Sequence, residues 1–269
     1  MKNYKLAMIQ MKVQGGEKKL NLNNAKKLIN EAISNGASVV LLPECMDLGW
    51  TSPTSQTMAE SIPDGSVCKT LAKLAKDNSI YICSGLTEKD GDKVYNSSVI
   101  INKQGEVICK HRKLNELEIG HEYYAHGDRI NVIETEYGTF GLMICADART
   151  MDHNWTRALC HMGADVILSP TSWAVGADHN NIENPYGNAW RNAYIPEAKE
   201  FGVYIIGTSN VGNVVGGPWA GWNCIGCSLA IGPNGEEILQ GPYGVDAETI
   251  LYVDIKPRKR SVRGSSWNK

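Results

Sequence analysis

The chain lacks the features of several protein classes. Its 269 residues contain no long run of Pro, Gly and Ser that would link two domains, and no repeat with the period of a solenoid or propeller. The formal net charge is -2, which gives no basic surface for nucleic acid. Neither glycine-rich phosphate motif, G-x-G-x-x-G after a strand or G-x-x-x-x-G-K-[ST], is present. The sequence therefore predicts one globular domain with no nucleotide cofactor and no nucleic-acid partner.

Long hydrophobic runs are also absent. The first apolar run, residues 6–9, is far too short for a signal peptide or a membrane span, so we expect a cytoplasmic protein without a membrane partner. In that compartment the eight cysteines stay reduced, and most of them are expected to be small core residues. Cys224 and Cys227 have the spacing of a zinc knuckle, but no second Cys/His pair with ligand spacing accompanies them. We predict no metal site.

Short apolar runs rich in β-branched residues alternate with segments of helical periodicity. The apolar runs predict buried strands at residues 6–11, 39–42, 81–84, 97–101, 141–145, 166–168, 203–206 and 250–255. The intervening segments predict helices at residues 20–34, 66–77, 154–162 and 187–201. Turn-forming sequences at residues 102–105 and 232–235 indicate β-hairpins, so we expect mixed sheets. The predicted fold class is α/β.

The domain is expected to span residues 1–256. Residues 257–269 are basic and poorly patterned. Because the rest of the chain is nearly neutral, we interpret this C-terminal arm as a solvated or subunit-clasping segment and not as a nucleic-acid site.

One apolar run ends at a cysteine. Residues 140–144 read Phe-Gly-Leu-Met-Ile and lead into Cys145, and a helix is expected to follow. In α/β sheets, ligands bind at the carboxyl ends of strands, and the N–H groups of a following helix favour a thiolate. Cys145 is therefore a candidate nucleophile. A buried core thiol at the end of a strand is the structural alternative.

Two charged residues also follow strand-like runs. Glu44 comes after residues 39–42 and Pro43, and it is either a solvated loop residue or a general base that deprotonates a thiol and later activates water. Lys113 closes the run that begins at Val107. It is either a solvated lysine or a cation, held between carboxylates, that stabilises an oxyanion.

The order Glu, Lys, Cys at three strand ends resembles the nitrilase, or carbon-nitrogen hydrolase, superfamily, in its amidase or N-carbamoyl amidohydrolase branch. The similarity extends over nearly the whole chain. It is carried by the opening strand to Gln10, Leu42-Pro43-Glu44, Arg112-Lys113, residues 144–149, Trp190-Arg191 with Ala198, Asn210-Val211-Gly212 and residues 232–235. The resemblance implies a four-layer α-β-β-α sandwich.

The resemblance also implies a role for each of these residues. Glu44 would be the general base, Lys113 the oxyanion-stabilising lysine and Cys145 the nucleophile. The backbone N–H of Ala146 would complete the oxyanion hole.

A second active-site glutamate is implied as well. In the family it precedes an aromatic stretch that ends in glycine, and we assign it to Glu122, with Glu118 as the competitor. Trp173 matches a position that commonly lines the substrate pocket, with a buried structural tryptophan as the alternative.

Two residues depart from the family pattern. His111 stands where a tyrosine or phenylalanine is frequent, and Ala146 stands where a bulky aromatic residue often follows the nucleophile. A small residue beside Cys145 would either widen the pocket or leave space for another aromatic side chain. The resemblance therefore leaves the size of the substrate open.

The implied reaction is attack of Cys145 on an amide or N-carbamoyl carbon, loss of ammonia or an amine, and hydrolysis of the thioester, without a cofactor. A nitrilase that acts on C≡N with the same residues is one alternative, and a catalytically silent binding module of the same fold is another. The expected partners are a small amide, ureido or nitrile substrate and further copies of the chain, in a homodimer or a larger even-numbered homo-oligomer.

Overall fold

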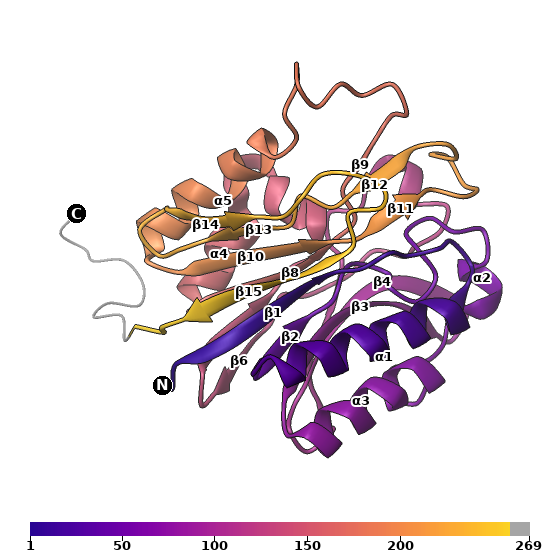
Figure 1. Ribbon diagram of the computed structural model, residues 1–269. Helices are drawn as coiled ribbons and strands as arrows, with labels where there is room; N and C mark the ends of the chain where they lie inside the picture. Colours follow the sequence, from indigo (N-terminus) through magenta and orange to yellow (C-terminus); the bar gives the residue numbers. More distant parts are fainter. Residues whose placement is uncertain (259–269) are drawn as a thin grey trace.

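The computed structural model describes residues 1–258, which form a four-layer α-β-β-α sandwich (Figure 1). Two six-stranded sheets make the middle layers. Helices α1 (Lys18–Ser34) and α3 (Ser66–Asn78) cover the outer face of the first sheet, and α4 (Asn154–His161) and α5 (Asn188–Phe201) cover that of the second. The predicted fold class is confirmed. Of the predicted C-terminal arm, residues 259–269 lie outside the described residues.

The first sheet has the strand order β15-β1-β2-β3-β4-β5. Its strands are β1 (Tyr4–Gln10), β2 (Val39–Leu41), β3 (Tyr81–Asp90), β4 (Lys93–Ile101), β5 (Val107–Arg112) and β15 (Thr249–Ile255). β1, β2 and β3 run parallel, and the other neighbours pair antiparallel. The predicted hairpin at residues 102–105 is confirmed, since it joins β4 to β5.

The second sheet has the order β14-β13-β10-β8-β7-β6. Its strands are β6 (Val132–Thr135), β7 (Gly138–Leu142), β8 (Val166–Thr171), β10 (Tyr204–Ser209), β13 (Leu229–Ile231) and β14 (Glu237–Gln240). β7, β8 and β10 run parallel, and the predicted hairpin at residues 232–235 joins β13 to β14. The remaining elements are α2 (Ser55–Met58), the 3-10 helices η1 (Glu118–Gly120), η2 (Cys145–Arg149) and η3 (Met151–His153), and a small sheet of β9 (Ala174–Val175), β11 (Val211–Asn213) and β12 (Asn223–Ile225).

Both faces of the central strands are buried, which explains their continuous apolar sequences. Along β1, Leu6 and Met8 point between the two sheets, while Ala7 and Ile9 point toward α1 and α3. Phe140, one of only two phenylalanines in the chain, packs between the sheets with its ring centroid 6.1 Å from that of Tyr4. Within residues 1–258, no helix is both long and apolar enough to cross a bilayer.

The predicted strand at residues 141–145 ends earlier than expected. β7 stops at Leu142, and Cys145 has a φ of 44°, in the left-handed region that a non-glycine residue rarely adopts. The Ile144 N–H, which a continued strand would direct to a neighbour, donates to the Asp147 carboxylate at 2.9 Å. The Asp147 side chain therefore replaces the backbone carbonyl of a neighbouring strand as the acceptor, and the chain leaves the sheet at this point.

Candidate active site

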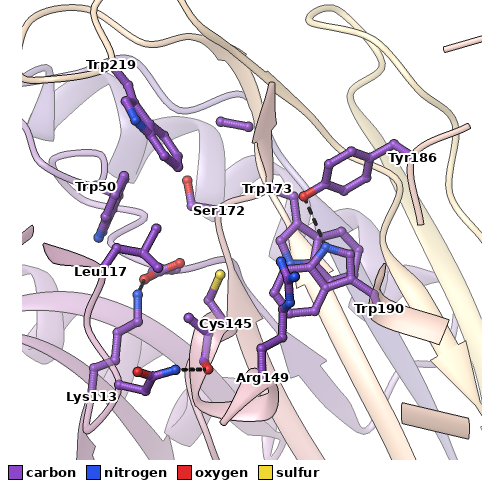
Figure 2. Close-up of a pocket in the computed structure, with 14 residues that line it drawn as sticks. Trp50, Lys113, Leu117, Cys145, Arg149, Ser172, Trp173, Tyr186, Trp190 and Trp219 are labelled. Carbon is purple, nitrogen blue, oxygen red and sulfur yellow. Dashed lines mark hydrogen bonds and ion pairs between the residues drawn. The ribbon is translucent and has the colours of Figure 1, made fainter. Parts of the chain in front are cut away.

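Three of the predicted site residues meet at one end of the sandwich. Glu44 lies three residues beyond β2, Lys113 follows β5 directly, and Cys145 lies three residues beyond β7. All three line one cavity of about 430 Å³, into which the Cys145 sulfur points (Figure 2). Glu44 and Lys113 come from the first sheet and Cys145 from the second, so the site is assembled from both.

The turn that carries Glu44 is held against both sheets. A Cβ at Gly85 in β3 would lie 2.5 Å from the Glu44 Cα, so only glycine lets this turn pack so closely on the strand. On its other side, the Glu44 N–H donates to the Thr171 carbonyl of β8 at 3.1 Å. The backbone of Glu44 is thereby fixed between the two sheets.

The cation of Lys113 lies between two buried carboxylates. Its Nζ donates to the Oε1 of Glu44 at 2.7 Å and to the Oε1 of Glu116 at 2.9 Å. All three side chains are almost completely buried. Glu116 also accepts a hydrogen bond from the Trp50 indole at 3.2 Å. The lysine therefore has one fixed position beside Cys145.

This environment changes the pKa of both partners. Burial raises the pKa of Glu44; the Lys113 cation opposes the rise and Glu116 adds to it, and the net pKa lies above the ordinary value. Burial alone would lower the pKa of Lys113, but the charges of Glu116 and Glu44 outweigh it, and the pKa is raised well above its ordinary value. Lys113 thus stays charged at neutral pH, while Glu44 is more basic than a solvated carboxylate.

The surroundings of Cys145 raise the pKa of its thiol above the ordinary value. Burial raises its pKa and the charge of Glu44 raises it further, against the opposing effects of Lys113 and of a backbone hydrogen bond from Ser172. Such a thiol needs a base before it can attack. Its left-handed backbone conformation is a strained state of the kind found at functional sites.

Asn96 in β4 fixes the two carboxylates relative to each other. Its Nδ2 donates to the Glu44 Oε1 at 2.6 Å and to the Glu116 Oε2 at 3.0 Å. Its Oδ1 in turn accepts the thiol of Cys45, with the two atoms 3.4 Å apart. Burial raises the pKa of Cys45 well above its ordinary value, so this thiol is a donor and sets the orientation of the Asn96 amide.

Asp147 ties the nucleophile turn to the loop that carries Lys113. Its carboxylate accepts the N–H of Asn115 at 2.7 Å as well as that of Ile144, and His111 Nε2 lies 2.8 Å away. Burial would raise the pKa of Asp147, but His111 and the backbone donors outweigh it and hold the pKa below its ordinary value. His111, a departure from the family pattern, therefore holds this anion in place.

The structure does not bring Glu122 to the site, and this corrects the sequence-based assignment. Glu122 and its competitor Glu118 are both exposed and do not line the cavity. The aromatic stretch instead turns Tyr124 inward, where its hydroxyl accepts the Thr51 N–H at 2.9 Å. Glu116 occupies the position beside Lys113. Its spacing of three residues from the lysine was the signal in the sequence that could have identified it.

Five of the eleven other residues that line the cavity are aromatic. Ala146 and Trp173 are two of the lining residues. The cavity is also lined by Trp50, Tyr186, Trp190 and Trp219, which no sequence pattern marked as pocket residues. Arg149 is exposed at the cavity, with its guanidinium 5.6 Å from the centre of the Trp190 ring (Figure 2). Among the ion pairs of residues 1–258, none involves this arginine.

The chain is similar to known proteins over nearly its whole length. Residues 5–263 match the family described as Carbon-nitrogen hydrolase. The chain is 34% identical over 255 residues to a protein of Pyrococcus abyssi named Nitrilase, covering 93% of this chain and 90% of the relative. It is 30% identical to the bovine (Bos taurus) Omega-amidase NIT2, covering 96% and 91%. The crystal structure of Saccharomyces cerevisiae Nit3, a member of branch 10 of the nitrilase superfamily, superposes with a TM-score of 0.79 at 25% identity, covering 95% and 90%.

Proposed function

Because the chain belongs to the carbon-nitrogen hydrolase family and is a carbon-nitrogen hydrolase, we propose that it hydrolyses the terminal amide of a small molecule through a thioester on Cys145. The observation that carries this proposal is the buried Lys113 cation, shared by Glu44 and Glu116 at the cavity that Cys145 enters. The group combines a nucleophile, a base of raised pKa and a fixed positive charge.

In the first half-reaction, Glu44 accepts the thiol proton and the Cys145 sulfur attacks the amide carbon. The carbonyl oxygen becomes an oxyanion, which the Lys113 ammonium and the Ala146 N–H stabilise. Glu44 then returns its proton to the amide nitrogen, the C–N bond breaks and ammonia leaves. The product of this step is an acyl thioester on Cys145.

In the second half-reaction, water replaces ammonia. Glu44 accepts a proton from the water, whose oxygen attacks the thioester carbon, and the C–S bond then breaks. The carboxylic acid is released and the proton returns to the thiol. We assign to Glu116 the task of holding Lys113, because it accepts a hydrogen bond from the Lys113 Nζ whereas Glu122 is exposed and does not line the cavity.

The cation of Arg149, which has no ion-pair partner within residues 1–258, indicates the charge of the substrate. A guanidinium at a cavity and without a carboxylate partner among the described residues favours a ligand that carries an anion. We therefore propose that the substrate bears a carboxylate at the end remote from the amide. The relative named Omega-amidase supports an amide substrate.

A nitrilase activity is the second candidate, because one relative carries that name. Ammonia release from matched amide and nitrile pairs tests the choice, and faster release from the nitriles would reverse it. A Cys145→Ala variant should lose all activity, and a Cys68→Ala control, changed in the distant helix α3, should retain it. Activity that survives in Cys145→Ala would refute the proposed nucleophile.

Two further expectations belong to this proposal. We propose a homodimer or larger even-numbered homo-oligomer, which sedimentation at micromolar concentration tests, and a monomer would contradict it. We also propose a cytoplasmic location, which suits eight free cysteines. Fractionation of the producing cells measures it, and recovery outside the cytoplasm would contradict it.

A further inference from the structure

The cavity beside Cys145 has two aromatic walls. The first wall consists of Trp173, Trp190 and Tyr186, and the second of Trp50 and Trp219. Figure 2 shows them on opposite sides of the Cys145 sulfur. A substrate whose carbonyl carbon reaches that sulfur must therefore place its acyl group between the two walls.

Contacts behind the cavity hold the first wall rigid. The Trp173 and Trp190 rings stack with centroids 4.6 Å apart and planes inclined by 19°. The Trp190 indole N–H donates to the Tyr186 hydroxyl at 3.0 Å. Both indoles are almost fully buried. A flat ligand meets this wall without first ordering it, which favours binding.

The second wall is supported in the same way. Trp50 and Trp219 meet edge to face with centroids 4.9 Å apart. Trp219 also stacks on Trp222 at 4.3 Å, with the two planes 7° from parallel. Two walls of oriented rings offer stacked and edge contacts that an aromatic group satisfies better than an aliphatic group of equal size.

Ala146 leaves the room that such a group needs. It follows the nucleophile directly and lines the cavity with a single methyl group. An apolar cavity of roughly 150 Å³ holds one benzene molecule, and this one has a volume of about 430 Å³. It can hold an aryl ring together with the carboxamide, whereas an acetamide-sized substrate would leave most of it unfilled.

We propose that the space between the two walls is an acyl subsite for an aryl group, and that Ala146 is the residue that determines this specificity. The inference rests on the proposed amidase function and extends it to arylalkyl amides, in which the ring would lie between the carboxamide at Cys145 and the remote carboxylate at Arg149. The polar groups Glu44 and Lys113 line the cavity together with Cys145 and bond to each other at 2.7 Å, so they orient the carboxamide while the ring lies against tryptophan.

The test compares phenylacetamide with cyclohexylacetamide, which has a ring of similar size but no π-system. We expect kcat/KM for phenylacetamide to be about tenfold higher. In Ala146→Tyr the added phenol fills the subsite, so the ratio of kcat/KM for phenylacetamide to that for propionamide should fall at least about tenfold. Lys73→Tyr, a control that adds the same phenol on the exposed face of helix α3, should keep the ratio of the original protein.

A binding measurement on an inactive variant tests the aryl subsite independently of amide hydrolysis. Calorimetry on the Cys145→Ala protein should show phenylacetate binding more tightly than cyclohexylacetate, with the difference lost in Cys145→Ala/Ala146→Tyr. Equal binding of the two acids, or an unchanged substrate ratio in Ala146→Tyr, would overturn the subsite even if amides are hydrolysed. Tight phenylacetate binding without ammonia release from any amide would support the subsite and refute the proposed amidase function.

Discussion

Replacing Lys113 by methionine should destabilise the protein as well as inactivate it. Methionine keeps most of the volume of lysine but removes the charge between Glu44 and Glu116. The two carboxylates bond to one Nζ at 2.7 and 2.9 Å, so the bonded oxygens are at most about 5.6 Å apart; at an effective dielectric constant of about 20, two unit charges at that separation repel by about 3 kcal/mol.

That repulsion agrees with the loss of about 3–5 kcal/mol that follows when one partner of a buried ion pair is removed. For a domain of this size, it corresponds to a fall in Tm of about 6–20 °C. The loss of one oxyanion-stabilising group should lower kcat by about 10²–10³-fold. Calorimetric unfolding and ammonia release measure the two effects.

The destabilisation of Lys113→Met should depend on pH. Without the cation, the folded-state pKa of a buried carboxyl lies above its unfolded value, so the destabilisation is present at high pH and disappears as the pH falls through the folded-state pKa. The Tm difference between Lys113→Met and the original protein should therefore be larger at pH 8 than at pH 5. Protonation of one carboxyl relieves the repulsion.

A surface lysine provides the control. Lys73 pairs with Asp77 at 2.6 Å, but both side chains are largely exposed, and such pairs contribute only about 0.3–0.5 kcal/mol. Lys73→Met should unfold within about 2 °C of the original protein. If Lys113→Met shifted Tm at pH 8 by no more than this control does, or by equal amounts at both pH values, the reasoning from buried charge would be refuted.

Three further predictions concern the same cavity. Asn96→Ala removes a hydrogen bond that lowers the pKa of Glu44, so the acid limb of kcat/KM should move to higher pH, and an unmoved pH profile would contradict this role. Arg149→Met should lower kcat/KM at least about tenfold for amides with a remote carboxylate but not for neutral ones, a pattern that a purely structural arginine would not give. Iodoacetamide should modify Cys145 and spare the fully buried Cys45, as peptide mass mapping would show; the reverse order would exclude Cys145 as the accessible thiol.

Helices and strands were predicted best where the apolar periodicity of the sequence matches the burial of the side chains. The helix predicted at residues 187–201 is α5 (Asn188–Phe201), and the apolar run at residues 39–42 contains β2. Predicted strands that form hairpins were too short. β3, for example, continues to Asp90 because its antiparallel ladder with β4 extends past the apolar residues. The periodicity of one strand does not predict how far it pairs with its neighbour.

The site shows the same division. Glu44, Lys113 and Cys145 are recognisable because each follows a strand, and strand ends converge. Glu116 was missed because a loop side chain can turn either way, and only the tertiary structure determines that Tyr124 points inward while Glu122 points to solvent. The aromatic walls were missed for a related reason. Trp50 and Trp219 are far apart in the sequence, and no local pattern indicates that they meet.

The hydrogen bond from the Glu44 N–H to the Thr171 carbonyl crosses from one sheet to the other. Glu44, the proposed base, follows a strand of the first sheet, and Cys145, the proposed nucleophile, follows a strand of the second. The hydrogen bond therefore holds the two sheets at a fixed separation next to the site. Any slide of one sheet over the other would separate Glu44 from Cys145 before the apolar layer around Phe140 opened. Catalytic activity thus depends on the alignment of the two sheets. On heating, activity should be lost at a lower temperature than the secondary structure.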